Sequence, residues 1–347
     1  MAPPGARPPR AAPFRDPALV PRGRPAYLFA RNDRSGRLGK SKETPRGGWA
    51  DWMADRALRG LIALALTLPL RSRLRIMGWA VRRVIAPLAG YRTRVLDNLA
   101  HVWPDLPEPE RQRIADEVTE NAGRTMIENY DVGGLLERMK DAPVSGDGLP
   151  EIERARAEGR PVLFVTGHYG NFEAPRAALV ARGWRIGGLY RPMANPFFNE
   201  HYAANMHALS DPVFEQGRRG TMGLLKHIRG GGMGVLLFDV YSSDGTPIDF
   251  LGQPAPTLTS SAEIAVKTGA LFVPFFGIRQ PDGVSFEAVF EAPIPHGDPV
   301  EMMRAATRRL EARIEADPGQ WFWIHRRWKP KRQAKRQRKR AAARMAP

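Results

Sequence analysis

The second half of the chain alternates short apolar runs with segments of helical periodicity, and this alternation limits the possible folds more than any other feature. Short apolar runs bounded by turn residues are typical of buried strands, and strands that alternate with helices are typical of a parallel sheet. We expect strands at 161–167, 184–190, 234–240, 271–278 and 284–292, and helices at 171–183, 221–231, 261–270 and 301–317. The sequence therefore predicts an α/β fold with a largely parallel central sheet flanked by helices.

The region before this domain contains the two most hydrophobic stretches, residues 57–70 and 76–90. Each is shorter than the roughly 20 apolar residues that cross a bilayer, and arginines flank both. A marginal transmembrane anchor, a pair of amphipathic helices lying in the membrane interface, and a buried core helix are all compatible with this pattern. We expect residues 48–92 to be membrane-associated helices, followed by an α/β domain over 93–330 that begins with helices.

The net charge of +17 is concentrated at the two ends of the chain. Residues 1–47 carry 11 Lys/Arg against three acids, and residues 326–347 carry 11 Lys/Arg and no acid, so the middle of the chain is close to neutral. We expect 1–47 to be a disordered, basic, proline-rich extension and 331–347 a disordered basic tail. Such tails suit anionic lipid headgroups or solvent, and no nucleic-acid partner is expected.

One segment combines residues that are suited to catalysis. Gly167-His168-Tyr169-Gly170-Asn171-Phe172-Glu173 follows an expected strand and opens an expected helix, where ligands of α/β sheets gather. A histidine can accept the proton of a hydroxyl nucleophile, and a carboxylate on its other ring nitrogen fixes the tautomer. This spacing also arises by chance, so the pair alone is weak support for catalysis. The chain has no cysteine, which excludes thiolate catalysis and cysteine-based metal sites.

The H-x4-E segment is accompanied by further blocks in a fixed order. They are Tyr190-Arg191-Pro192, Phe238-Asp239, Asp249-Phe250-Leu251-Gly252-Gln253-Pro254-Ala255, Lys267-Thr268-Gly269-Ala270 and Gln320-Trp321-Phe322-Trp323-Ile324-His325-Arg326-Arg327-Trp328. Through these blocks the chain resembles the bacterial lipid A biosynthesis acyltransferases, the lauroyl and myristoyl transferases acting on Kdo-lipid IVA, within the wider class of H-x4-D/E glycerolipid acyltransferases. The resemblance covers roughly residues 50–330.

The resemblance implies a reaction and its surroundings. The donor would be an acyl-acyl carrier protein, and the acceptor a hydroxyl on a 3-hydroxyacyl chain of a lipid A precursor. No metal or organic cofactor is expected. The enzyme would lie at the cytoplasmic face of the inner membrane.

The resemblance also assigns residues. His168 would be the general base and Glu173 its orienting partner. Arg191 would bind a phosphate of the acceptor or the donor's phosphopantetheine, and Asp239 would pair with Arg191 or hold the shape of the site.

The paired arginines near the end of the chain complete this assignment. Arg326 and Arg327 would bind acceptor phosphates or the acidic carrier protein. The same blocks leave two other functions open. One is acylation of another glycolipid or a lysophospholipid, and the other is a non-catalytic, basic-tailed protein that binds membranes or nucleic acid.

Overall fold

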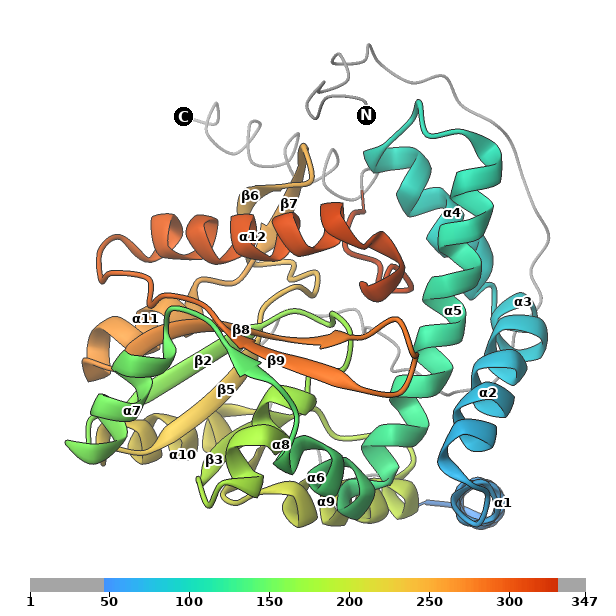
Figure 1. Cartoon of the computed structure of the whole chain (residues 1–347), viewed down its shortest axis with the longest axis horizontal. Coiled ribbons are helices and arrows are strands. Elements are labelled where there is room, and N and C mark those ends of the chain that lie inside the picture. The colour runs from blue at the N-terminus through green and yellow to red at the C-terminus, as the bar shows by residue number, and fades with distance from the viewer. Residues whose placement is uncertain (1–46, 330–347) are drawn as a thin grey trace, which may run out of the picture.

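The computed structural model describes residues 47–329. The predicted basic segments 1–47 and 331–347 lie outside the described residues, apart from Gly47. Within 47–329 the chain forms a central sheet covered by helices on both faces, with a group of helices at one end (Figure 1).

The central sheet has seven strands in the order β1-β9-β8-β2-β5-β3-β4. Every neighbouring pair is parallel except β8 and β9, which are antiparallel. This confirms the predicted α/β fold with a largely parallel sheet. The strands are β1 (Val144–Ser145), β2 (Val162–Thr166), β3 (Ile186–Tyr190), β4 (Val213–Glu215), β5 (Met233–Leu237), β8 (Leu271–Arg279) and β9 (Phe286–Phe290).

Successive side chains of the central strands enter different cores. Leu163 and Val165 of β2 pack with α12, whereas Val162 and Phe164 pack with α8 on the opposite face. Because both faces are covered, β2 is apolar at every position but its last, as is typical of parallel strands. One face carries α10 (Arg218–Arg229), α11 (Ser260–Thr268) and α12 (Pro299–Ala316), and the other α6 (Val132–Lys140), α7 (Leu149–Ala157) and α8 (Ala174–Ala181).

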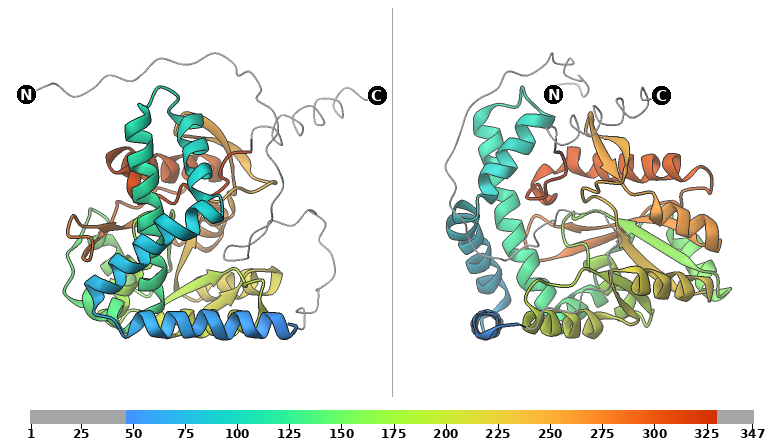
Figure 2. Two further views of the ribbon diagram at one scale, coloured as in Figure 1. Left: turned by 90° about the vertical axis from the view of Figure 1, so that its right-hand side faces the viewer. Right: turned by 180° about the vertical axis from the view of Figure 1, so that it is seen from behind.

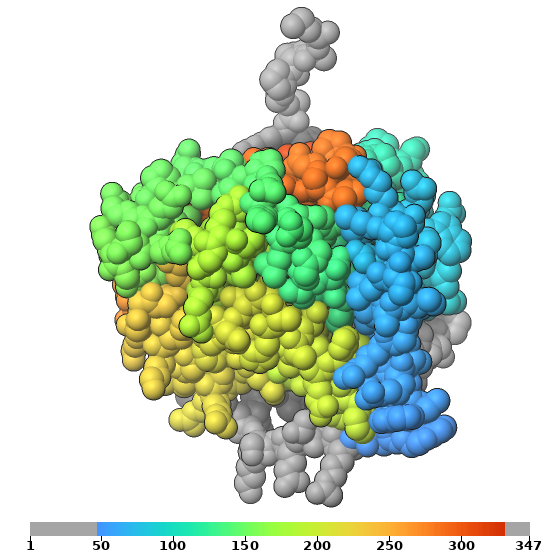
Figure 3. Space-filling model, turned by 60° about the horizontal axis from the view of Figure 1, so that its bottom comes forward, coloured from blue at the N-terminus to red at the C-terminus, as the bar shows by residue number. Residues whose placement is uncertain are grey.

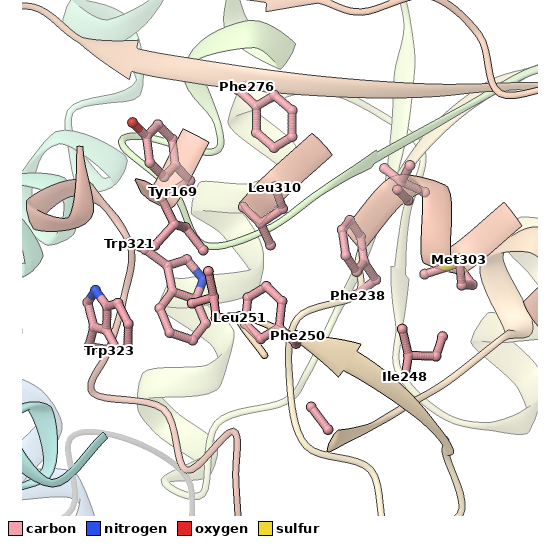
Figure 4. Close-up of a cluster of buried hydrophobic side chains, with 14 of the residues drawn as sticks. Tyr169, Phe238, Ile248, Phe250, Leu251, Phe276, Met303, Leu310, Trp321 and Trp323 are labelled. Carbon is pink, nitrogen blue, oxygen red and sulfur yellow. The ribbon is translucent and has the colours of Figure 1, made fainter. Parts of the chain in front are cut away.

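The larger core continues beneath a two-stranded hairpin, β6 (Thr246–Phe250) and β7 (Gln253–Thr257). Figure 4 shows Phe250 and Leu251 of the hairpin beside Trp321 of the segment that follows the 3₁₀ turn Pro318–Gln320. The rings of Phe250 and Trp321 meet edge-on at 5.2 Å between centroids. The hairpin thus joins the segment 321–328 to the core.

The helices before the sheet form a separate layer at one end of the molecule. They are α1 (Trp49–Leu66), α2 (Leu70–Ala80), a π-helical turn (Val81–Ile85), α3 (Ala86–Leu88), α4 (Tyr91–Val102) and α5 (Glu108–Tyr130). Helix α1 lies across one end of α5 (Figure 2), near α9 (Pro196–Leu209). No helix within residues 47–329 is long and apolar enough to cross a membrane.

Helices α2 and α5 pack closely because glycines stand at their contact. A Cβ at Gly123 would come within 2.4 Å of the carbonyl oxygen of Met77, and one at Gly78 within 2.7 Å of Glu120. The buried Arg73 of α2 also forms an ion pair with Asp131, which begins α6. The N-terminal helices are therefore fixed to the α/β domain.

The structure contains elements that the sequence pattern does not predict. They are the helices α7 and α9, the short strands β1 and β4, and the hairpin β6–β7. The hairpin sequence Thr246–Thr257 contains three prolines and no clear alternation, so nothing local marks it as a pair of strands. Tertiary packing against the carboxyl-terminal aromatic residues decides its form.

Candidate active site

The H-x4-E segment forms a tight loop at the carboxyl end of β2. Gly170 has φ of 55°, and a Cβ there would lie 1.9 Å from the carbonyl oxygen of Gly277. Only glycine fits this position, because it combines a left-handed backbone with a close approach to β8. The loop is also tied to the carboxyl-terminal segment, since Gly170 N donates to Gln320 O (2.9 Å) and Phe322 N to His168 O (2.9 Å).

His168 forms a pair with a buried carboxylate. Its Nδ1 lies 2.7 Å from Oδ1 of Asp239, and its backbone N–H donates to Oδ2 at 2.7 Å. The indole Nε1 of Trp321 donates to the same Oδ2 at 2.9 Å. Asp239 follows β5 and is 1% exposed, so this carboxylate is fully enclosed by its donors. A carboxylate has no proton to donate, so the hydrogen lies on Nδ1 and leaves Nε2 of His168 as an acceptor.

The charge of Asp239 is maintained against the effect of burial. Burial alone raises the pKa of this carboxyl, but His168 and its hydrogen bonds, with a smaller effect from His325, hold the pKa well below its usual value. Asp239 is therefore ionised at neutral pH and stabilises positive charge on the His168 ring.

Glu173 does not occupy the position that the sequence predicts. The orienting carboxylate on His168 Nδ1 belongs to Asp239, while Glu173 stands before α8 with its Oε2 3.4 Å from NH1 of Arg176. Arg176 is fully buried and also donates to the carbonyls of Ile186 and Ser210. A buried guanidinium is costly without a counter-ion. Glu173 supplies that counter-ion, so its carboxylate pairs with Arg176 and not with the imidazole.

The predicted contact between Asp239 and Arg191 is also not formed, because Asp239 is bonded to His168 and Trp321. Arg191 follows β3 and is exposed, without an ion-pair partner among residues 47–329. Its role as a phosphate ligand stays a prediction, and the same holds for the exposed Arg326.

Arg327 has a structural position and not the phosphate-binding one that the sequence predicts. It is 1% exposed, its NH1 donates to Pro256 O at 2.8 Å, and its NH2 donates to Thr257 Oγ1 at 2.5 Å. Its guanidinium also stacks on Phe250 at 5.2 Å. Burial lowers its pKa to about 10, which still leaves it charged at neutral pH. Arg327 therefore fastens the β6–β7 hairpin to the segment 321–328, and its buried guanidinium is not exposed to a phosphate.

An apolar cavity of about 280 Å³ extends from His168 to helix α1. Helix α5 supplies one wall, with residues at helical spacing on a single face, and α1 and α9 supply others. The end near α1 is formed by Leu58, Ile62, Met77, Met126, Tyr130, Met193 and Phe198, and the end near the loop after β2 by His168, Phe172, Trp321, Phe322 and His325.

Two features of the site are not predicted by the sequence. Trp321 donates to Asp239, and His325 lies in the cavity wall with its ring centroid 4.4 Å from that of His168. The order of the blocks indicates that the segment 320–328 contributes to the site. Which of its side chains reaches His168 depends on the packing of the β6–β7 hairpin. No cluster of three or more His, Asp or Glu suited to a metal occurs within residues 47–329.

An imidazole–carboxylate pair at one end of an apolar cavity is an arrangement that suits general-base chemistry on a substrate with a long apolar part. Residues 46–330 match the family described as bacterial lipid A biosynthesis acyltransferase. The chain therefore belongs to this family, and it is an acyltransferase of lipid A biosynthesis.

Curated relatives agree with this assignment. The chain is 25% identical to the lipid A biosynthesis acyltransferase of Haemophilus influenzae, over 67% of this chain and 74% of the relative. It is 24% identical to the lipid A biosynthesis myristoyltransferase of Escherichia coli, over 82% and 88%. It is 25% identical to the lipid A biosynthesis lauroyltransferase of the same organism, over 81% and 92%.

Proposed function

We propose that this enzyme transfers a fatty acyl group from the thioester of an acyl-acyl carrier protein to a hydroxyl of a lipid A precursor, with His168 as general base and Asp239 as its positioning residue. The observation that carries the proposal is the His168–Asp239 hydrogen bond of 2.7 Å at one end of the apolar cavity. The names of the relatives support the acceptor class.

The proposed reaction is a direct transfer. Nε2 of His168 takes the proton of the acceptor hydroxyl while its oxygen attacks the thioester carbonyl carbon. The new C–O bond forms, the carbonyl electron pair moves onto oxygen, and Asp239 stabilises the imidazolium. The intermediate then collapses, the C–S bond breaks, and the proton on His168 passes to the leaving thiolate. An acyl-enzyme is not needed, because the hydroxyl attacks the thioester itself.

The acyl chain of the donor would occupy the cavity. The walls are largely apolar, and the cavity begins at His168 and ends among Ile62, Met126 and Phe198. Burial of each methylene contributes about 0.8 kcal/mol, so a cavity that extends away from the base binds the chain and places the carbonyl near Nε2. Because α1 forms part of the wall, the N-terminal helices contribute to donor selection.

The acceptor phosphates would meet the exposed arginines. Arg191 follows β3, at the same edge of the sheet as the loop after β2, and Arg326 follows His325 directly. Both are exposed cations without an ion-pair partner among the described residues. A guanidinium binds a phosphate with two parallel hydrogen bonds, which suits an acceptor of this class.

The outer face of α1–α3 would rest on the cytoplasmic face of the inner membrane. This short segment contains nine of the 13 exposed large apolar side chains of residues 47–329, among them Trp49, Leu64, Trp79 and Leu88. Figure 3 shows α1 and α2, in blue, along one side of the molecule. Exposed arginines accompany them, including Arg71, Arg75 and Arg83. Aromatic and aliphatic side chains interspersed with arginine are typical of helices that lie in an anionic membrane interface.

The test of the proposed reaction uses the purified full chain with acyl-acyl carrier protein and a lipid A precursor. We expect transfer by the wild type and a loss of at least ~10²-fold in kcat for His168→Ala. Equal rates in both proteins would exclude His168 as the base. If neither folded protein acylates the precursor, the same assay with lysophospholipid acceptors tests the alternative acceptor class.

A further inference from the structure

We propose that His325 is a second catalytic residue, which donates a hydrogen bond from its imidazole to the thioester carbonyl oxygen as that oxygen becomes an oxyanion. This inference rests on the function proposed above. His168 removes the proton from the attacking hydroxyl, and His325 stabilises the negative charge that the attack creates. No bond to His325 forms or breaks, so the balance of the transfer is unchanged.

An oxyanion donor must lie beside the base, and His325 does, since both histidines line the cavity. Their ring centroids are 4.4 Å apart and the rings meet edge-on at 77°. A hydroxyl bound to His168 would attack a thioester carbon that lies between the two rings. The carbonyl oxygen of that thioester would then be close to the imidazole of His325.

The backbone around His325 is fixed by several hydrogen bonds. Nδ2 of Asn98, on α4, donates to the carbonyl oxygens of Trp323 (2.7 Å) and His325 (2.9 Å). Arg94 of the same helix donates to Ile324 O at 3.2 Å. His325 N in turn donates to Phe322 O at 3.1 Å. Preorganised donors of this kind stabilise a transition state without reorganisation at the moment of reaction.

The imidazole of His325 has an unused polar atom. Its Nε2 is buried and forms no hydrogen bond within residues 47–329, an arrangement that is unfavourable in a folded protein. Within residues 47–329, one other side-chain atom of the cavity wall is buried without a hydrogen bond, and it is Oδ1 of Asn129. This oxygen is an acceptor and cannot stabilise an oxyanion. A substrate oxygen would supply the partner that the protein does not.

Other side chains of the wall are already engaged. Asn121 Nδ2 donates to Gly319 O at 3.0 Å, Thr125 Oγ1 to Gly170 O at 3.1 Å, and Gln320 Nε2 to Arg279 O at 3.0 Å. These donors hold the loop after β2 and the segment around Gly319 and Gln320 in place. Among the wall residues of the loop after β2 and of the segment 320–325, His325 is thus the side chain, beside His168, with a nitrogen left for a ligand.

The charge state of His325 separates the roles of the two histidines. Burial lowers its pKa to about 3, and the charges on His168, Arg327 and Arg94 act in the same direction, whereas Asp239 opposes them. His325 is therefore neutral at physiological pH and has one N–H to donate. It does not compete with His168, which Asp239 favours as the site of the positive charge.

The experiment compares His325→Leu, His325→Gln and the wild type in the transfer assay, with kcat, KM for the donor and the pH dependence of kcat/KM. We expect His325→Leu to lower kcat about 10²–10³-fold with KM within threefold, as for loss of one oxyanion donor. His325→Gln keeps an N–H donor and should recover at least tenfold of that loss. The pH profile should remain that of the wild type in both variants.

Three results would overturn the proposal. The first is a His325→Leu rate within threefold of wild type. The second is a Gln variant no faster than the Leu variant while both are folded by circular dichroism. The third is a shift of the apparent pKa in kcat/KM, because that indicates a merely supporting contact with His168. Failure of the proposed function itself is distinguishable, since the wild type would then show no transfer.

Discussion

His168 and Asp239 lie 71 positions apart in the chain, yet Nδ1 of one is 2.7 Å from Oδ1 of the other and the backbone N–H of His168 binds the same carboxylate. They meet because β2 and β5 are parallel neighbours, so the loops that follow them emerge at the same edge of the sheet. The carboxylate that orients the base is therefore supplied by the sheet topology and not by the helix that follows His168.

The half-buried His325, whose Nε2 is enclosed, should make the protein sensitive to acid. Its pKa is lowered to about 3 in the folded state, whereas the unfolded chain protonates near pH 6.5. The unfolded state thus binds the extra proton between these values, and stability falls as pH decreases through this window. We expect His325→Gln to lose less stability than wild type between pH 7 and pH 4 in urea unfolding. An equal loss in both proteins would show that His325 protonates freely in the fold.

The end of the cavity near α1 should set the preferred acyl length. Ile62 is 7% exposed and lies with Phe198 in the apolar cluster at that end. We expect Ile62→Trp to shorten the space and shift the preferred donor by two carbons or more, measured with a series of acyl-acyl carrier proteins. Val266→Trp, at an exposed site on α11, is the matched control and should leave the preference unchanged. An unchanged preference in Ile62→Trp would place the acyl chain elsewhere.

Neighbouring arginines in the carboxyl-terminal segment should behave differently. Arg327→Leu removes the bonds to Pro256 and Thr257, so we expect a loss of about 2–4 kcal/mol in the free energy of unfolding. Arg326→Leu, at an exposed position, should leave stability within about 0.5 kcal/mol and raise KM for a phosphorylated acceptor. A stable Arg327→Leu protein with a raised acceptor KM would instead restore the phosphate role predicted for Arg327.

The apolar outer face of α1–α3 should bind lipid. We expect the combined change of Leu64, Trp79 and Leu88 to serine to reduce flotation with zwitterionic vesicles at high salt, where attraction by the basic ends of the chain is screened. The matched control changes Met222, Val240 and Val266, three exposed apolar residues on other elements, to serine. Equal loss in both triple variants would argue against a dedicated face.

The sequence predicts the sheet, and the position of His168 at the end of β2, because their signals are local. The apolar runs of β2, β5 and β8 and the glycines around His168 are visible in the chain itself. The partner of His168 is not predictable in this way. Glu173 is near in sequence but is drawn to the buried Arg176, while Asp239 reaches the imidazole through the order of the strands. The positions of Trp321, His325 and Arg327 depend on the β6–β7 hairpin, whose strands have no local signature.

A double-mutant cycle of transfer rates for His168→Ala, Asp239→Asn and the combined variant, with Glu173→Gln beside them, decides which carboxylate acts with the base. We expect Asp239→Asn to lose at least ~10²-fold in kcat per folded molecule and to add no further loss to His168→Ala, because the carboxylate acts through the imidazole. Glu173→Gln should mainly lower stability and stay within about tenfold of the wild-type rate. A fast Asp239→Asn enzyme, together with a Glu173→Gln enzyme as inactive as His168→Ala, would show that Glu173 and not Asp239 is the partner of His168.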